Sequence, residues 1–288
     1  MAIKYGNQFV DEKYSSAIEP NLYSDTVLIP GVTYTEKYQE GPAGQIMVHK
    51  LDGGDVVTPG LPGRDFNDES AKDELIQIAF NNNFQKSRKI YGVQEASVSF
   101  AMAEEYLADA LKSTLDGRQY SGVACLVREG TTSSDTAEVT ADNVVAKLTA
   151  IRKQIKDNKG RANFAMVSTD IYALLLQKIG IQSYADPSVV SGELMRRFGL
   201  TIIECNSFDK ANAKYYDYTG TERTVNLTNV DMIVGYNEAF SLIDNFTAYR
   251  LRDAEGFVGS KAQVEYNTAL RVNSPAQIVV KTHGSITV

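Results

Sequence analysis

The chain has 288 residues, of which 43% are hydrophobic and 23% are charged, so it is long enough for one large or two ordinary folded domains. Its net charge of −7 argues against tight, nonspecific nucleic-acid binding, which requires clustered Lys and Arg. The two cysteines form no CxxC motif, and no apolar run approaches the ~20 residues of a membrane span. The composition therefore argues against a disulfide framework and a membrane protein, and it predicts a reducing compartment such as the cytoplasm.

The first 40 residues are polar and contain several tyrosines, and prolines interrupt any long element. Only residues 25–29 have the character of a strand. Because this segment has little core of its own, we expect it to lie extended over another surface; the alternative is a partly ordered terminus.

Two predicted strands at residues 45–51 and 75–80 flank a polar, turn-rich loop at residues 52–73. Apolar residues alternate in both strands, with Ile46 and Val48 on one face of the first. The pattern indicates an extended hairpin. A lone two-stranded hairpin is marginal in water, so it needs a partner surface in its own chain or in a neighbour.

Residues 97–117 form the best predicted helix, because apolar residues recur at spacings of three and four and Gly117 suits a left-handed C-cap. The apolar run at residues 123–127 is interpreted as a short buried strand. An exposed loop is expected at residues 129–137.

The middle of the chain alternates helices with short buried strands. Thr140 is expected to cap a helix over residues 141–157, with Val144, Leu148, Ile151 and Ile155 on its apolar face. Ser168 is expected to cap a second helix over residues 169–179, closed by Gly180. Buried strands are predicted at residues 164–167 and 200–204, with a loop at 182–194.

The last third is rich in strands. A hairpin is predicted from residues 213–218 and 224–227, which flank the turn sequence TGTE. Residues 262–272 alternate in polarity six times in a row, which is typical of a half-buried antiparallel strand. Shorter strands are expected at residues 231–234, 240–243 and 277–281.

The sequence contains no phosphate-binding loop, dinucleotide fingerprint, zinc-protease motif or nucleophile elbow. The only histidines are His49 and His283, and a structural or solvated role is favoured for both. Cys125 and Cys205 lie among apolar residues and are interpreted as small core residues rather than nucleophiles. Adjacent Glu104 and Glu105 point about 100° apart on a helix, so they cannot flank one substrate.

Charged clusters give no clearer site. Two basic spots, at residues 196–197 and 153–161, could contact phosphate but are interpreted as salt-bridge partners. The acidic residues of the hairpin loop fit no EF-hand spacing, so an acidic loop tip is favoured over a calcium site; they are Asp52, Asp55, Asp65, Asp68 and Glu69. We therefore assign no catalytic, cofactor-binding or metal-binding residue and no cofactor, and we predict that the chain is not an enzyme.

The order of elements resembles that of the major capsid proteins of tailed bacteriophages, which share the Hong Kong 97 phage capsid fold. A polar arm, a long hairpin and an acidic, alanine-rich helix occur in that order. Three later stretches are also similar to the family: DNVVAKLTAIRKQIKDNKGRANFAMVSTDIYALLLQ (residues 142–177), FGLTIIECNSF (198–208) and AQVEYNTALRVNSPAQIVV (262–280). The resemblance spans residues 25–280 and lies in element order rather than in one invariant motif.

The resemblance implies an α+β capsid fold with an N-terminal arm (1–40), an extended loop built as a β-hairpin (41–92), a peripheral domain (93–139) with its spine helix at 97–117, an axial domain (140–238) and peripheral strands that return at 239–288. It implies a structural protein of the virion that self-assembles from pentamers and hexamers into an icosahedral shell around a DNA genome. Assembly would occur in the bacterial host cytoplasm, with weak, nonspecific contact to DNA and no membrane.

The resemblance also concerns partners and competing functions. Because the arm begins near Met1, a separate scaffolding protein is expected, together with a portal and decoration proteins. No motif marks Lys50, Lys72, Lys86 or Lys89 as reactive, so no covalent crosslink is predicted. The alternatives are an encapsulin-type nanocompartment around protein cargo, a small-molecule enzyme with an unrecognised site, and a monomeric binding module.

Overall fold

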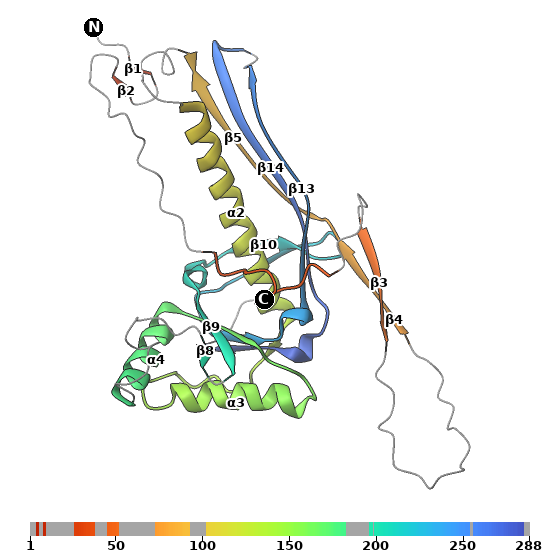
Figure 1. Ribbon diagram of the computed structural model, residues 1–288, viewed down its shortest axis with the longest axis vertical. Coiled ribbons are helices and arrows are strands. Elements are labelled where there is room, and N and C mark those ends of the chain that lie inside the picture. The colour runs from red at the N-terminus through yellow and green to blue at the C-terminus, as the bar shows by residue number, and fades with distance from the viewer. Residues whose placement is uncertain are drawn as a thin grey trace.

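The computed structural model describes residues 4–5, 8–9, 26–37, 45–51, 73–92, 102–182, 196–197, 199–253 and 256–284. One end of the molecule is a layered domain around a six-stranded sheet, and a long helix leads from it along a narrow three-stranded sheet (Figure 1). A separate hairpin projects from the middle (Figure 1). The architecture is therefore α+β, with two parts that extend away from the main core.

The six-stranded sheet is the centre of the layered domain. Its two faces bury alternate residues of the same strands: Phe164 and Met166 belong to the core on the side of helix α2 (Met102–Glu129), and Ala165 and Val167 to the core on the other side. The strand order is β6 (Thr131–Thr132), β15 (Ile278–Thr282), β12 (Val230–Gly235), β7 (Phe164–Val167), β9 (Leu200–Glu204) and β8 (Arg196–Arg197). β6–β15 and β7–β9 are parallel, and the other pairs are antiparallel.

Helix α2 spans Met102–Glu129, which corrects two predictions. The helix continues through Gly117 instead of ending there, and residues 123–127 form its buried last turns instead of a strand. A short apolar run fits a buried helix and a buried strand equally well, so periodicity could not separate them. Gly117 packs closely against Phe84, and a Cβ there would lie 3.3 Å from the ring of that residue. Residues 97–101 lie outside the described residues.

Helices α3 (Val144–Asp157) and α4 (Thr169–Gln182) cover the outer face of the six-stranded sheet. The predicted apolar face of α3 is confirmed, since Val144, Leu148, Ile151 and Ile155 are its buried residues. Thr140 does not cap α3, which begins after a turn at residues 141–143. The Ser168 hydroxyl accepts a hydrogen bond from the Ile171 amide (3.3 Å), as expected for a cap, whereas α4 continues past Gly180.

A three-stranded antiparallel sheet, which we call the blade, runs beside α2 (Figure 1). Its order is β13 (Phe240–Asp253), β14 (Gly259–Val272) and β5 (Asn82–Tyr91). The alternation predicted for β14 is confirmed by the burial of Ala262, Val264 and Thr268. Ala269, predicted on the other face, is buried as well, because the hairpin packs over it. β13 extends ten residues beyond the predicted 240–243, and β5 was not predicted.

Strands β3 (Gln45–Leu51) and β4 (Asp73–Ala79) form the predicted projecting hairpin, in a register that pairs Leu51 with Asp73. Its loop, residues 52–72, lies outside the described residues. β10 (Ala213–Tyr216) and β11 (Glu222–Val225) form the second predicted hairpin, with β11 starting two residues early. Strands β1 (Lys4–Tyr5) and β2 (Gln8–Phe9) also pair, and short 3-10 turns are η1 (Asn206–Asp209), η2 (Asn237–Ala239) and η3 (Pro275–Gln277).

The other outcomes concern short segments. The strands predicted at 231–234 and 277–281 are confirmed as β12 and β15, and those at 164–167 and 200–204 as β7 and β9. The loop predicted at 129–137 begins one residue late, because Glu129 ends α2, and it contains the short strand β6. Gln182 belongs to α4, while residues 183–194 of the expected loop lie outside the described part of the chain.

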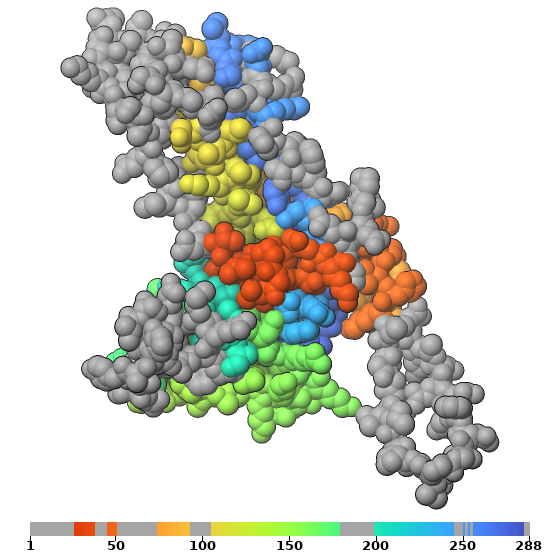
Figure 2. All heavy atoms as spheres, viewed as in Figure 1, coloured from red at the N-terminus to blue at the C-terminus, as the bar shows by residue number. Residues whose placement is uncertain are grey.

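Residues 26–37 of the arm cross the middle of the molecule (Figure 2). The segment is irregular rather than a strand, but Val27, Leu28 and Tyr34 are at most 2% exposed and belong to the main core. The Gln119 carboxamide oxygen accepts a hydrogen bond from the Val27 amide (3.0 Å). The expectation that the arm lies over another surface is confirmed for these residues.

Gly122 of α2 provides a test of this packing. A Cβ there would lie 2.4 Å from the tip of the Leu28 side chain, so Gly122→Val must displace this side chain from its buried position, and we expect it to lower the free energy of unfolding by about 1–3 kcal/mol. The control Lys112→Val changes an exposed position of the same helix and carries only a propensity cost of about 0.7 kcal/mol or less. Denaturant unfolding of both variants measures the difference, and equal losses would contradict the arm contact.

Candidate functional site

The structure separates the residues that sequence reasoning considered for chemistry. His49 lies on the exposed face of β3, and His283 lies just beyond β15. Cys125 is buried inside α2, and burial, followed by the nearby Glu129 carboxylate, raises the pKa of its thiol. Burial also raises the pKa of the Cys205 thiol to about 12. Neither cysteine is an activated nucleophile, because reactive thiols have lowered pKa values.

The charged clusters form no site within the part of the chain that the structure describes. No group of three or more His, Cys, Asp or Glu side chains there could hold a metal ion. Glu105 is exposed on α2, the Lys153–Arg161 region is mostly exposed, and β8 carries the Arg196–Arg197 pair at the edge of the six-stranded sheet. Asp52, Asp55, Asp65, Asp68 and Glu69 lie outside the described residues, as does the side chain of Glu104. Among the described helices, none combines the length and apolar character needed to cross a bilayer.

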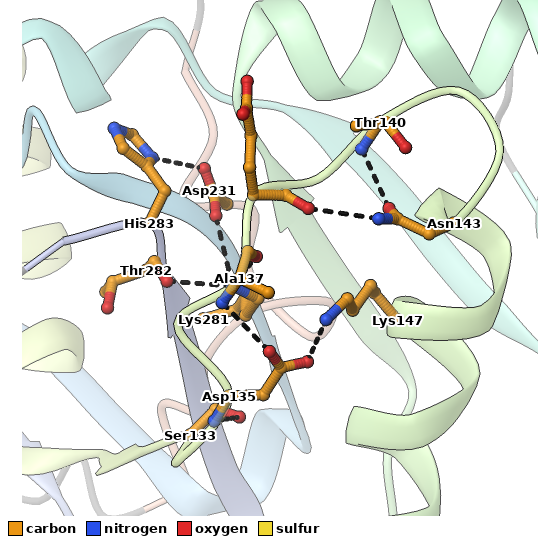
Figure 3. A network of polar contacts seen from close by, with 11 residues as sticks. Ser133, Asp135, Ala137, Thr140, Asn143, Lys147, Asp231, Lys281, Thr282 and His283 are labelled. Carbon is orange, nitrogen blue, oxygen red and sulfur yellow. Dashed lines mark hydrogen bonds and ion pairs between the residues drawn. The ribbon is translucent and has the colours of Figure 1, made fainter.

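A buried lysine instead ties the loop before α3 to the sheet (Figure 3). Lys281 on β15 is 0% exposed, and its ammonium group donates hydrogen bonds to the carbonyls of Ala137 (2.7 Å) and Thr282 (2.9 Å). Asp231 supplies the opposite charge, with its Oδ2 3.7 Å from Lys281 Nζ and its Oδ1 2.6 Å from His283 Nδ1. His283 therefore supports a structural ion pair.

An ion pair at the edge of the same loop extends this network (Figure 3). Lys147 on α3 donates a hydrogen bond to Asp135, and this bond lowers the pKa of the Asp135 carboxyl. The Asn143 side chain bridges the Thr140 amide (2.8 Å) and the Glu138 carbonyl (3.1 Å). Residues 133–143 are thus held to both β15 and α3.

A second polar cluster joins the arm, α2 and the blade. The Arg118 guanidinium donates two hydrogen bonds to Asp244 (3.0 and 2.6 Å) and one to the hydroxyl of Tyr34 (3.3 Å). Tyr266 and Thr268 of β14 donate to the same carboxylate (2.7 and 2.9 Å). Each oxygen of the half-buried carboxylate therefore has two donors, which is the condition for burying a charge without a large penalty.

A third cluster fixes the root of the projecting hairpin against the rest of the molecule. The Asn82 side chain exchanges hydrogen bonds with the Tyr216 amide (2.8 Å) and carbonyl (2.9 Å). Arg271 on β14 donates to the Gln77 carbonyl and lies 4.0 Å from the ring centroid of Tyr218. An apolar cluster of Ile76, Ile78, Ile243 and Ala269 lies beneath these contacts.

The turn of the β10–β11 hairpin is held rigid at this root. Burial alone would raise the pKa of Asp217, but hydrogen bonds from Thr219, Thr221 and Arg223 outweigh it, and the pKa is lowered. The Asn81 side chain donates to the Asp217 carbonyl (2.7 Å). These hydrogen bonds, which we call the polar frame of the hairpin root, therefore fix the direction in which the projecting hairpin leaves the molecule.

Beyond this frame, apolar side chains face outward. Met47 and Leu75 on the outer face of the hairpin are 52% and 50% exposed. At the far end of the blade, Val258 is 86% exposed beside the rings of Tyr91 and Phe257, whose centroids are 4.9 Å apart and whose planes are inclined by 50°. The projecting hairpin and the far end of the blade therefore offer exposed apolar surface for contact with another molecule.

The sequence analysis did not identify Lys281, Asp231, Arg118 or Asp244. Of the features that carry exposed apolar surface, it predicted the projecting hairpin. The available signal was a charge inside an otherwise apolar strand, as with Lys281 in the sequence IVVKT. A buried charge in such a strand requires a partner from elsewhere in the fold.

No protein-family model matches the sequence, and no curated protein matches it. Solved structures do match. A structure described as Mycobacterium phage Che8 has a TM-score of 0.72 at 14% identity, covering 98% of this chain and 100% of that chain. The capsid structure of cyanophage P-SCSP1u has a TM-score of 0.70 at 14% identity (94% and 92% covered), and the mature capsid of bacteriophage PhiM1 has 0.65 at 12% (94% and 91%).

The chain has the Hong Kong 97-type capsid fold. The predicted fold class is thereby confirmed, and the near-complete coverage of both chains means that hairpin, blade and layered domain all belong to it. At 14% identity or less, the similarity concerns the fold alone.

The Lys281 network gives a stability prediction. Lys281→Met leaves Asp231 buried without its lysine and the Ala137 carbonyl without its donor, so we expect the free energy of unfolding to fall by about 3–5 kcal/mol. The control Lys178→Met removes an exposed ion pair with Asp142 (3.3 Å) and should cost at most about 1 kcal/mol. Denaturant unfolding at pH 7 compares the two, and equal stabilities would show that Lys281 does not hold the loop.

Proposed function

We propose that this chain is a major capsid protein, which self-assembles into the icosahedral shell that encloses the DNA genome of a tailed bacteriophage. The observation that carries the proposal is the likeness to capsid structures over at least 91% of both chains. Its place would be the virion capsid, after assembly in the cytoplasm of a bacterial host.

The distribution of apolar surface supports a role in assembly. The hairpin buries Ile76 and Ile78 on one face but leaves Met47 and Leu75, on its other face, half exposed. Each Å² of apolar surface that a neighbour covers contributes about 25 cal/mol, so modest contacts repeated in every subunit stabilise a closed shell.

We propose the following division of the chain. Residues 1–40 form the arm, 41–92 the extended loop with strand β5, 93–139 the peripheral domain with α2 as its spine helix, 140–238 the axial domain, and 239–288 the strands that return to the peripheral domain. The blade consists of strands from the second and fifth of these segments. The layered domain draws on the third, fourth and fifth.

We propose that the principal partner is the chain itself, in pentamers and hexamers, and that scaffolding, portal and decoration proteins act beside it. A net charge of −7 favours weak, nonspecific contact with packaged DNA. The role is structural rather than enzymatic.

Sedimentation velocity and negative-stain electron microscopy of the purified chain test this function. We expect closed shells, tubes, or five- and six-membered rings, because a fold with projecting contact surfaces requires neighbours to cover them. Nucleic acid inside shells isolated from the host would identify a genome container, and protein cargo would contradict it. A homogeneous monomer of 31.7 kDa, with and without scaffolding protein, would overturn the proposal.

Shortening the hairpin tests the role of its loop. Replacement of residues 52–72 by Asn-Gly joins Leu51 to Asp73 through a two-residue turn that suits their antiparallel register. We expect the subunit to fold with an unchanged circular-dichroism spectrum and unfolding midpoint, while assembly is lost or misdirected in the electron microscope. Normal shells from this variant would refute a draping role for the loop.

A further inference from the structure

A groove of about 1050 Å³ opens on the layered domain between the segment before α3, the first turns of α4, η1 and the start of β12. Buried apolar side chains of Val139, Ile171, Phe208 and Val230 contribute to its lining. His283 and Asp231 of the Lys281 network also line it. The loop that Lys281 holds in place is thus one wall of the groove.

The charged groups of the groove are almost all acidic. Exposed Glu138, Asp170 and Asp209 line it, together with Asp231, and no Lys or Arg that the structure describes does so. Asp231 is already paired with Lys281 and His283. Glu138, Asp170 and Asp209 form no ion pair with another residue that the structure describes, so three carboxylates are available to an incoming partner.

The opposite charge gathers at the other end of α3. Lys153, Lys156, Lys159 and Arg161 are exposed there, accompanied by one acidic residue, Asp157. These four basic side chains likewise have no ion-pair partner among the described residues. We call residues 153–161 the basic end of the domain. Because α3 begins at Val144 and the basic end begins at Lys153, about 14 Å of helix separates the basic end from the groove.

We propose that the groove receives the basic end of a second copy of this chain, so that neighbouring layered domains bind head to tail. The two surfaces lie at opposite ends of one helix, so a chain cannot satisfy its own groove. A contact between two different surfaces of identical subunits is heterologous and closes into a ring when the rotation per subunit allows it. The pairing therefore supplies a heterologous contact that repeats from subunit to subunit, as pentamers and hexamers require. It rests on the proposed shell function.

A charge-swap experiment tests the pairing. The groove variant is Glu138→Lys with Asp209→Lys, which leaves Asp170 in the first turn of α4, where it favours the helix dipole. The basic-end variant is Lys159→Glu with Arg161→Glu, which leaves Lys156 in the last turn of α3. All four side chains are exposed, so each variant should keep the circular-dichroism spectrum and unfolding midpoint of the unchanged chain.

We expect each variant alone to lower the assembled fraction in sedimentation velocity about tenfold, because like charges then face each other across the contact. The chain that carries all four substitutions restores complementarity with no change in net charge, and it should assemble as the unchanged chain does. A control that reverses Lys112 and Lys261, both outside the layered domain, should also assemble normally.

The outcomes separate this inference from the function on which it rests. If the unchanged chain remains monomeric, the shell proposal itself fails. If the unchanged chain assembles but the two variants do so equally well, the head-to-tail contact is wrong while the shell stands. It is also wrong if the four-substitution chain stays defective, or if the control loses assembly to the same extent.

Discussion

Burial of residues 118–127 of helix α2 is the constraint on which the rest of the structure depends. These last turns pack in one core with the arm, the inner face of the six-stranded sheet and the roots of β13 and β14. Gln119 adds polar contacts inside this core, because it accepts from the Val27 amide and donates to the hydroxyl of Ser207 (2.7 Å). Segments far apart in the sequence thus meet on one helix, whose outer turns then support the blade.

Buried charges determine how the strands and loops meet this core. Arg118 and Asp244 connect α2 with β13, and the register of β13 against β14 shifts between Asp244 and Phe246, next to the carboxylate. Lys281 and Asp231 connect β15 with β12, and the same lysine holds the carbonyl of Ala137. Buried pairs add little net stability over apolar residues but penalise any arrangement that separates them. We infer that they select the register and loop path of this fold.

Much of the fold was predictable from the sequence where the information is local. The alternation of residues 262–272 and the apolar face of α3 require only the period of a strand or a helix. The polar strand β5 was not predictable, because NNFQKSRKIY shows little apolar alternation and forms an edge of the blade that is stabilised mainly by pairing with β14. The sequence of residues 123–127 fits a buried strand and a buried helix equally well. Their helical form depends on packing against the arm and the six-stranded sheet, which are distant in sequence.

The candidate contact surfaces were less predictable, because each combines residues that are distant in sequence. The hairpin was identified from its two strands, but its root depends on Asn82, Arg271 and Tyr218, which no local pattern connects. Arg271 lies on the strand that also forms the middle of the blade. Hairpin and blade are therefore attached to the same strand, so a neighbour that binds the hairpin acts on the blade through β14. Under the proposed shell function, a subunit with this construction would respond to its neighbours as one body.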